Sequence, residues 1–310
     1  VESGHTVRAV IMVIPGVMPE NIDLAAQVAS RLGIPFERID LQEEFEALVI
    51  TDFVNEYGNG RTPNPCVRCN KLVKFDLLLK KAEGGSPARI ATGHYARVEM
   101  TGDRFLLKKG RDKNEQSYFL YSLDQTQLSR AVLPLGEYTK EEVRRMARER
   151  GLPTAERRKS QDACFVPDAD YASFLRQRIL VEPGPVLDGE GNVVGRHKGI
   201  THYTVGQRHG IGISHSHPYY VTAIDAAKNT IYVGAQEDIC RKELTADRVN
   251  FIPFDRLDRA IEVNAKVRYF AAASPARIEP LTPGRVRVFF REPQWAITPG
   301  QSVVFYQGDL

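Results

Sequence analysis

The 310-residue sequence contains no uninterrupted apolar run near the roughly 20 residues that a membrane-spanning helix needs. Its first residues, VESGHTVRAVIMVIPG, lack the basic stretch and the small-residue cleavage site of a secretory signal peptide. Only four cysteines are present, and a small secreted disulfide scaffold would be shorter and richer in cysteine. These absences favour a cytoplasmic protein whose cysteines are reactive groups or metal ligands.

No sign of charge dominates the chain, which carries 42 Lys and Arg against 39 Asp and Glu, a net charge of +3. Nucleic-acid binding is therefore allowed but not demanded, because it depends on charge clustered on one face. Hydrophobic residues make up 42% of the chain, which is too many for a disordered protein and enough for a sizeable core. A length of 310 residues predicts two or three domains.

Strands and helices alternate through the first third of the sequence. The β-branched run at residues 7–14 predicts a buried strand, and the apolar spacing of residues 21–32 predicts a helix that ends at Gly33. The same criteria predict strands at residues 35–41 and 88–94, and helices at residues 43–57 and 70–83. Helices of this length between strands predict an α/β fold with a parallel sheet built from βαβ units.

The pattern changes toward short strands along the rest of the chain. Residues 95–110 predict a hairpin, a longer helical region follows from about Gln116, and Thr139 with Glu142 forms a capping box ahead of another helix. Hairpins are predicted at residues 184–195 and 219–234, and further strands at residues 199–213, 260–272, 276–290 and 301–308. The part after about residue 166 therefore predicts one or two small β-barrels.

The sharpest local feature is a C-x-x-C motif, Asn64-Pro65-Cys66-Val67-Arg68-Cys69-Asn70, which lies between a Pro-rich loop and a predicted helix. The helix N-terminus, together with Arg68 and Lys71, would stabilise a thiolate at Cys69. Such a motif serves as a redox dithiol, as half of a metal site or as a nucleophile with a neighbour, and it also occurs without any function. The sequence has no second C-x-x-C and no His pair at ligand spacing, which disfavours a zinc ribbon.

Two other cysteines and a strand end complete the candidate groups. Cys164 follows the basic stretch ERRKSQ, where positive charge would lower the pKa of its thiol, but it could equally be a small core residue. Cys240 lacks such surroundings and is interpreted as structural. Gly93 and His94 follow a predicted strand, and ligands of doubly wound sheets bind at the carboxyl ends of strands.

Basic residues admit two interpretations, phosphate-backbone binding or a solvated face. They form two groups, Lys108, Lys109, Arg111 and Lys113, then Arg144, Arg145, Arg148, Arg150, Arg157, Arg158 and Lys159. The pair Arg268 and Tyr269 joins a charge to an aromatic ring, which suits contact with RNA and also suits an ordinary strand.

Six sequence words occur in one order along nearly the whole chain, and together they resemble the bacterial and mitochondrial tRNA-specific 2-thiouridylases. The words are Gly60-Arg-Thr-Pro-Asn-Pro-Cys-Val-Arg-Cys-Asn-Lys71, Ala91-Thr-Gly-His-Tyr-Ala-Arg97, Glu115-Gln-Ser-Tyr-Phe-Leu120, Ser160-Gln-Asp-Ala-Cys-Phe-Val166, Tyr203-Thr-Val-Gly-Gln-Arg208 and Thr298-Pro-Gly-Gln301. The set is far more specific than any one motif.

The resemblance implies a PP-loop ATPase-like domain of the adenine nucleotide alpha hydrolase type at residues 1–166. It further implies a small central β-rich domain at residues 167–240 and a tRNA-contacting β-barrel at residues 241–310. The implied reaction is 2-thiolation of the wobble uridine of tRNA with ATP and Mg²⁺. The C2 oxygen attacks the α-phosphate of ATP, pyrophosphate leaves, and a protein-borne sulfur then displaces AMP. The implied partners are tRNAs for Lys, Glu and Gln and a sulfur-relay protein or cysteine desulfurase, with no membrane.

The resemblance also implies roles for individual residues. Cys164 matches the cysteine that carries a persulfide, and Cys69 matches the nucleophile that resolves it, which leaves a Cys69–Cys164 disulfide. Met12 and Gly93 match ATP contacts. The stretch that touches the target base matches Asn64, Pro65 and Cys66, and the other tRNA-contacting positions match His94, Asn114, Glu115, Gln116, Arg268, Tyr269 and Gln301.

Two departures from the family pattern leave alternatives open. The phosphate-binding loop Ser-Gly-Gly-x-Asp-Ser, which the family places about one helix before Val1, is absent from the sequence. We therefore expect a chain cut at both ends; without an upstream loop it would be a tRNA-binding fragment without catalysis. Cys66 stands where some members carry Asp, so Cys66, Cys69 and Cys164 could instead ligate an iron–sulfur cluster.

Overall fold

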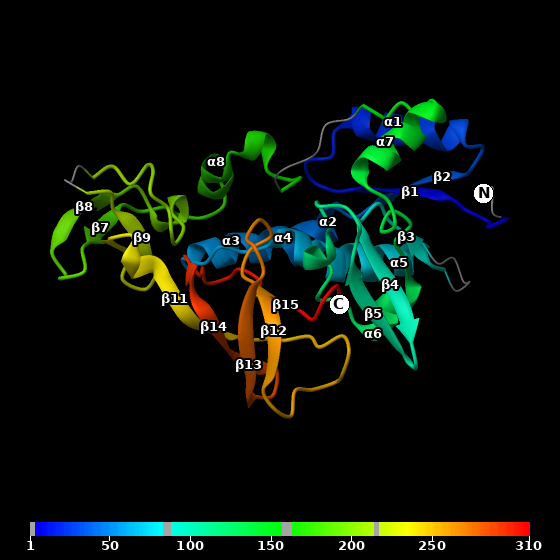
Figure 1. The fold of residues 1–310 in the computed structure, drawn as a ribbon. Coiled ribbons are helices and arrows are strands. Elements are labelled where there is room, and N and C mark those ends of the chain that lie inside the picture. The colour runs from blue at the N-terminus through cyan, green and yellow to red at the C-terminus, as the bar shows by residue number, and fades with distance from the viewer. Residues whose placement is uncertain (1–3, 83–87, 157–162, 214–216) are drawn as a thin grey trace. The chain divides into compact units, whose positions relative to one another are not determined.

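The computed structural model describes residues 4–82, 88–156, 163–213 and 217–310 (Figure 1). The chain forms two compact units, and each is described by itself. Unit 1 comprises Val1–Ile50 and Cys66–Ala169, and unit 2 comprises Thr51–Pro65 and Asp170–Leu310. Three basic residues named above, Arg157, Arg158 and Lys159, lie outside the described residues, as do the first three residues of the word that contains Cys164.

Unit 1 begins with a strand–helix–strand unit formed by β1 (Ala9–Val13), α1 (Pro19–Arg31) and β2 (Phe36–Asp40). β1 and β2 pair in parallel along their whole length, which confirms the predicted start of the fold. Pro19 occupies the first turn of α1, where its fixed φ suits a helix and its missing N–H costs nothing.

Two helical stretches follow, and both contain π-helical turns. α2 (Gln42–Phe45) continues into a π-helical turn at Glu46–Ile50, and α4 (Pro65–Arg68) continues into a π-helix at Cys69–Leu77 and then into α5 (Leu78–Ala82). A π-helix hydrogen-bonds residues five apart and occurs most often at functional sites. Side chains five positions apart, such as Cys69 and Lys74, therefore lie one turn above each other.

The remaining strands of unit 1 form two small ladders. β3 (Ile90–Ala91) pairs in parallel with β6 (Ala131–Val132), and β4 (Ala96–Thr101) pairs with β5 (Arg104–Lys109) in the predicted hairpin. Among the described residues, the two parallel pairs β1–β2 and β3–β6 are separate ladders and do not join into one sheet.

The helices in the second part of unit 1 follow the sequence signals only in part. α7 (Lys140–Glu149) begins at the predicted capping box, with the Glu142 N–H donating to Thr139 Oγ1 over 3.2 Å. The helix expected from about Gln116 is wrong: only a 3₁₀ turn at Ser117–Phe119 and the short α6 (Gln125–Arg130) form there, and another 3₁₀ turn lies at Pro167–Ala169. The side chains of Glu115 and Gln116 bond to nearby N–H groups, and such local bonds compete with helix formation.

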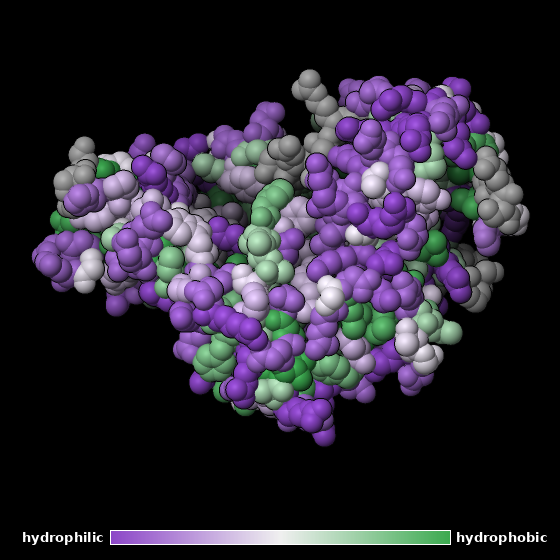
Figure 2. All heavy atoms as spheres, in the orientation of Figure 1, coloured by the Kyte–Doolittle hydropathy of each residue, from purple (hydrophilic) through white to green (hydrophobic). Residues whose placement is uncertain are grey.

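The basic face of α7 is solvated. No residue of α7 is buried, and Figure 2 shows hydrophilic side chains over α1 and α7. Arg145 pairs with Glu149, and Arg148 pairs with Glu156. The described part of this basic group is therefore accessible to solvent, and Arg145 and Arg148 form ion pairs within the protein.

Unit 2 contains α3 (Thr51–Gly58), α8 (Tyr171–Arg176) and two sheets. The first sheet has the strand order β8-β7-β10-β9 and consists of β7 (Gly184–Leu187), β8 (Val193–His197), β9 (Tyr220–Asp225) and β10 (Thr230–Gly234). Its two antiparallel hairpins were both predicted. The strands expected at residues 199–213 are wrong, because a 3₁₀ turn lies at Ile200–His202 and Gly199 and Gly206 adopt positive φ angles that interrupt a strand.

The second sheet of unit 2 is a five-stranded antiparallel sheet. Its order is β11-β14-β13-β12-β15, with β11 (Cys240–Ala246), β12 (Ile261–Lys266), β13 (Ser274–Thr282), β14 (Arg285–Trp295) and β15 (Val304–Tyr306). A 3₁₀ turn at Glu237–Ile239 leads into β11. Alternate residues of the strands, among them Val263, Ile278 and Val288, are buried in one core. Among the described residues, no helix is both long and apolar enough to cross a bilayer.

The protonation of His197 is expected to make the stability of unit 2 depend on pH. It is 1% exposed, its Nδ1 accepts from the Gly199 N–H, and its Nε2 therefore donates to the Asn229 carbonyl. Burial lowers the pKa of His197, so the unfolded chain takes up its proton at a higher pH than the folded protein. This contribution to stability is present above about pH 6.5 and is lost as the pH falls, by up to about 1.4 kcal/mol per pH unit.

The measurement is urea unfolding between pH 5 and pH 8, followed by the fluorescence of Trp295, which lies in β14 of unit 2 and is the single tryptophan. His197→Gln should flatten the fall in stability below pH 6.5. His209→Gln, at an exposed position, should leave it unchanged. An equal acid sensitivity in all three proteins would contradict the prediction.

Candidate active site

The C-x-x-C motif lies at the beginning of the helix that runs through α4 and the π-helix. Pro65 takes the first helical position, Cys66 is exposed, and Cys69 is 8% exposed. The neighbours Val67 and Val73 are buried and hold this side of the helix against the core of unit 1. One thiol of the motif therefore faces solvent and the other faces the protein.

Cys164 lies at the tip of a tight turn in unit 1. The Val166 N–H donates to the Ala163 carbonyl over 3.0 Å, and both residues are buried. Phe165 is also buried and packs edge-on against Phe45 at 5.6 Å between ring centroids. Cys164 itself is exposed, so buried residues on both sides anchor a turn that presents its thiol.

Gly16 holds this turn in place, and sequence reasoning missed it. Gly16 follows β1 with a φ of +87°, and a Cβ atom there would lie 2.5 Å from the Cys164 carbonyl oxygen and 2.8 Å from Phe165 Cα. The Pro15-Gly16 pair is an ordinary turn signal. Nothing in it indicates a contact with residue 164.

We call Cys66, Cys69 and Cys164 the thiol site, because they interact electrostatically. A negative charge on Cys164 raises the pKa of both other thiols, and one on Cys66 raises that of Cys69. The three thiols therefore lie near one another in unit 1, although Cys164 is distant from Cys66 and Cys69 in the sequence.

Burial governs the ionisation of the thiol site. It raises the pKa of Cys69 to about 11, and it also raises the pKa values of Cys66 and Cys164, although both side chains reach solvent. The expected low pKa of Cys69 and of Cys164 is thus wrong. The loss of water around a thiolate raises the pKa by more than the nearby positive charge lowers it.

Among the described residues, neither Arg68 nor Lys71 is the cation that acts on the thiols, and Arg157, Arg158 and Lys159 lie outside the described residues. The Arg68 Nε donates to the Leu48 carbonyl, which ties this side chain to the preceding π-helical turn. The cation that lowers the pKa of all three thiols is Lys74, one π-helical turn after Cys69.

Metal binding at the thiol site was the alternative that the sequence left open. Within the described residues, no group of three or more His, Cys, Asp or Glu side chains is placed to hold a metal ion. An iron–sulfur cluster on Cys66, Cys69 and Cys164 would need their sulfur atoms in one ligand arrangement. The arrangement of the described residues therefore gives the iron–sulfur alternative no support.

The strand end at Gly93 and His94 lies in the same unit. The His94 Nδ1 lies 2.8 Å from Thr92 Oγ1, and the His94 ring lies 6.1 Å from Phe75 of the π-helix. Burial, together with the charge of Lys74, lowers the pKa of His94 to about 3, so this ring is neutral at physiological pH.

The two residues expected at ATP lie on or beside the parallel strands. Met12 is half-buried in β1 opposite Ile39, and Gly93 follows β3. A Cβ atom on Gly93 would meet only Leu135 Cδ1, at 3.7 Å. The backbone at Gly93 is therefore open to the approach of a ligand.

Residues 114–116 form a loop around a buried carboxylate that sequence reasoning missed. Asp112 is 8% exposed and accepts from the N–H groups of Asn114 and Lys140 over 2.6 and 2.7 Å. Burial alone would raise the pKa of Asp112, but these donors outweigh it and lower the pKa. Glu115 accepts from Ser117, and Gln116 accepts from the Tyr95 N–H, so the side chains of the loop are used within the protein.

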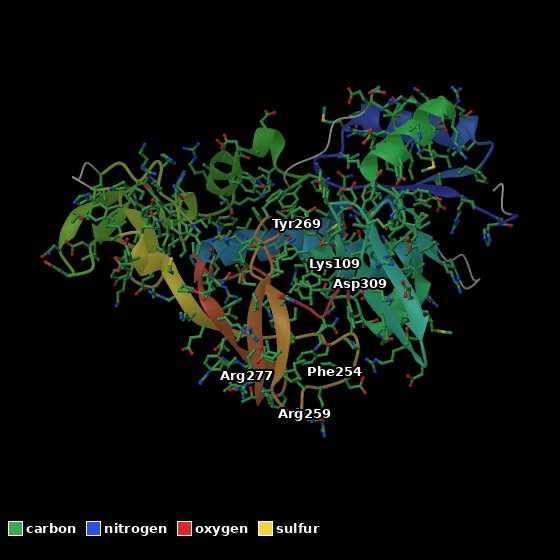
Figure 3. The ribbon with its side chains drawn as sticks, in the orientation of Figure 1. Lys109, Phe254, Arg259, Tyr269, Arg277 and Asp309 are labelled. Atoms are coloured by element: carbon green, nitrogen blue, oxygen red, sulfur yellow. The ribbon has the colours of Figure 1, made fainter. Side chains whose placement is uncertain are left out.

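Unit 2 holds the other residues that the resemblance assigned to tRNA. The Arg268 guanidinium donates to the Ala296 carbonyl and, over 2.8 Å, to Thr298 Oγ1, which braces the sheet. Tyr269 lies in the loop between β12 and β13, away from Arg277 and Arg259 (Figure 3). Its ring lies edge-on to Phe270, which is 87% exposed, and the β12–β13 loop is hydrophobic on the face shown in Figure 2.

The loop before the C-x-x-C motif is fixed within unit 2. The Thr62 N–H donates to the Pro299 carbonyl over 2.8 Å, and Thr62 Oγ1 bonds to Thr204 Oγ1 over 3.3 Å. Gly300 packs so closely on Thr62 that a Cβ atom would lie 2.9 Å from its nitrogen. Three of the six sequence words therefore meet here. Asn64, Pro65 and Gln301 follow these contacts directly and are half-buried.

Comparison with protein families matches three consecutive segments of the chain. Residues 9–168 match the tRNA methyl transferase HUP domain, residues 172–235 the tRNA methyl transferase PRC-barrel domain, and residues 241–310 the aminomethyltransferase beta-barrel domain. This succession confirms the predicted fold class, an α/β domain followed by a small central domain and a β-barrel.

Similar curated proteins share most of the chain. The tRNA-specific 2-thiouridylase MnmA 1 of Caldanaerobacter subterraneus subsp. tengcongensis is 50% identical over 291 residues, which are 92% of this chain and 80% of that protein. The corresponding MnmA of Halothermothrix orenii is 48% identical over 94% of this chain and 82% of its own length. That of Clostridium acetobutylicum is 46% identical over 93% and 82%. The chain belongs to the family of tRNA-specific 2-thiouridylases.

Proposed function

We propose that this chain catalyses the ATP-dependent 2-thiolation of the wobble uridine of tRNA, in the cytoplasm, through a persulfide on Cys164. The observation that carries the proposal is the thiol site, in which three thiols from two distant segments interact within one unit. Sulfur transfer needs one thiol to carry sulfur and a second to release it, and methyl transfer needs neither.

Cys164 suits the role of sulfur carrier. Its thiol is exposed at the tip of an anchored turn, where a donor protein with its own persulfide can reach it. We assign the donor to a sulfur-relay protein or a cysteine desulfurase. Since buried Phe165 and Val166 fix the turn, the loaded sulfur stays in one place.

Cys69 suits the role of the resolving nucleophile. In the transfer step, the terminal persulfide sulfur forms a bond to C2 of the uridine as the activated C2 oxygen leaves. The Cys69 thiolate, having lost its proton, attacks Sγ of Cys164 and breaks its bond to the transferred sulfur. The electron pair of that bond stays on the sulfur now held by the uridine. A Cys69–Cys164 disulfide remains, and a dithiol reductant reopens it with two electrons.

ATP is assigned to the strand ends of unit 1, near Met12 and Gly93. When bound, it supplies the activation that turns the C2 oxygen into a leaving group. Mg²⁺ is bound in many nucleotide sites mainly through substrate phosphates. The described residues offer no three-ligand protein site, so we assign Mg²⁺ to the phosphates of ATP.

Gly93→Ala tests the ATP assignment. The added methyl meets only Leu135 at 3.7 Å, so stability should change by less than about 0.5 kcal/mol. If a nucleotide lies against this backbone, the KM for ATP should rise about tenfold or more. Gly189→Ala, at an open position in unit 2, is the matched control. An unchanged KM for ATP in Gly93→Ala would remove Gly93 from the site.

The residues that we propose to contact tRNA come from both units, and those of each unit are considered separately. In unit 1 they are Cys66, His94 and the loop Asn114, Glu115 and Gln116; in unit 2 they are Asn64, Pro65, Arg268, Tyr269 and Gln301. Because His94 is neutral, we assign it a hydrogen bond rather than a charge contact with RNA. The intraprotein bonds of Asn114, Glu115, Gln116 and Arg268 indicate that they shape the surface that RNA meets.

The experiment that tests the proposed function measures 2-thiouridine. The protein expressed from the whole coding region that contains this chain is incubated with ATP, Mg²⁺, a persulfide donor and unmodified transcripts of tRNAs for Lys, Glu and Gln. Thiolated tRNA is retarded in a mercury-containing gel. Retardation that depends on ATP supports the proposal. Binding of tRNA without any thiolation would replace it with a tRNA-binding module.

A further inference from the structure

We propose that Lys74 is the positioning residue of the thiol site. Its ammonium group stabilises the thiolate forms of the three cysteines, one after another. This proposal deepens the proposed function and rests on it only for the assumption that these thiols react. Its test reads ionisation itself, so either proposal can fail while the other holds.

The position of Lys74 follows from the π-helix. Because this helix bonds residues five apart, Lys74 lies one turn beyond Cys69 on the same side. The Lys74 ammonium donates to Asn70 Oδ1 over 3.1 Å. Asn70 is 1% exposed, and its amide donates in turn to the Phe119 carbonyl over 2.9 Å. A buried amide therefore holds the half-buried ammonium within the π-helix, one turn beyond Cys69.

The electrostatics agree with this placement. Within the part of the chain that the structure describes, the charged groups that act on the thiols are Lys74 and the thiols themselves. Burial raises their pKa values, and the Lys74 charge lowers each of them. Burial, and to a smaller extent the Lys74 charge, lowers the pKa of His94, so the His94 ring is neutral and adds no positive charge. One ammonium thus faces three thiols that repel each other once ionised.

Because the three thiols share the charge of Lys74, their ionisation follows an order. While Cys164 is a thiolate, its charge opposes ionisation of Cys69, whose pKa is about 11. Once Sγ of Cys164 is bonded to the sulfur that has moved to the uridine, this charge is gone. The ammonium is then free to stabilise the Cys69 thiolate. Lys74 therefore couples formation of the resolving nucleophile to the arrival of sulfur.

The test compares Lys74→Met, Lys74→Gln and Lys74→Arg with the parent protein. Rates of alkylation by iodoacetamide are measured for each cysteine from pH 7.5 to pH 10 by peptide mass spectrometry, in the absence of tRNA. Lys74→Met and Lys74→Gln should slow all three thiols about three- to tenfold at fixed pH, and Lys74→Arg should stay within about twofold of the parent. The NMR titration of His94 should move to higher pH in the two neutral variants.

Two controls separate charge from fold. Lys71→Met removes a lysine from the same helix and should leave the alkylation rates unchanged. Cys240 in unit 2 reports any general change in alkylation. Unchanged rates in both neutral variants would overturn the proposal. An equal loss in Lys74→Arg would also overturn it, because the effect would then come from packing. If Lys74→Met does not fold, Lys74→Gln, whose amide can still bond to Asn70, decides.

Discussion

Cys164→Ser and Cys69→Ser are each expected to reduce thiolation from a persulfide donor by at least about a thousandfold. The reason is chemical: a serine hydroxyl can neither carry a persulfide nor attack a sulfur–sulfur bond at neutral pH. The measurement is the initial rate of 2-thiouridine formation in the mercury-gel assay, at saturating ATP and tRNA. Both substitutions are nearly isosteric, so the melting temperature should hardly move.

Free sulfide in place of the persulfide donor should remove the need for either cysteine, because no sulfur–sulfur bond then has to be broken. If Cys164 serves only as the carrier, sulfide should restore most of the activity of Cys164→Ser. The reaction with sulfide should leave no disulfide in the protein. Cys240→Ser is the matched control, since Cys240 lies in unit 2 and its sulfur is 3.9 Å from the Gln236 carbonyl. Full activity of Cys69→Ser with the persulfide donor would refute the resolving role.

Gly16→Ala should cost about a hundredfold in thiolation, although Gly16 carries no side chain and is not assigned to any reaction step. A residue with a Cβ pays about 1–2 kcal/mol for a left-handed conformation, and here the Cβ would also lie 2.5 Å from the Cys164 carbonyl oxygen. Because that atom is backbone, the turn that presents Cys164 must move. A displacement near 1 Å at a reacting group is enough for a loss of this size.

Gly33→Ala provides the comparison for Gly16→Ala. Gly33 has a similar φ of +64°, but a Cβ atom there would meet nothing within 4 Å. Both variants should therefore lose stability from the backbone angle, and Gly16→Ala should lose more because of the clash with Cys164, as measured by thermal unfolding. Only Gly16→Ala should also lose thiolation and change the alkylation rate of Cys164. Equal thiolation by the two variants would show that the contact with Cys164 does not matter.

The fold was largely predictable where local signals agree with each other. The hairpin β4–β5 and the capping box of α7 were predicted because turn residues and side-chain caps act within a few residues. The expected strands at residues 199–213 were wrong because the apolar pattern there is interrupted by glycines with positive φ, whose angles a pattern does not reveal. The helix expected after Gln116 was wrong because polar side chains bond to their own backbone.

The thiol site was predictable in its residues but not in its electrostatics. Cys69 and Cys164 stood out through sequence words, and the structure places them in one unit with Cys66. Their pKa values depend on burial, which a linear neighbourhood of Arg and Lys does not report. Lys74 was missed because sequence reasoning uses α-helical spacing, whereas a π-helix brings residue i+5 to the same side.

The π-helix at Cys69–Leu77 also constrains how this sequence can change in length. A one-residue deletion between Cys69 and Lys74 would let the segment relax into an ordinary α-helix with more regular hydrogen bonds. The deletion would leave the lysine at position i+4 and turn every later side chain by about 100° relative to the cysteines. Selection for stability alone would favour the shorter helix. Because i and i+4 share a face of an α-helix, the lysine would stay near Cys69, and the side chains that lose their direction are later ones such as the buried Phe75. The irregular helix is therefore expected to persist only while the thiols and the core behind them must both keep their present directions.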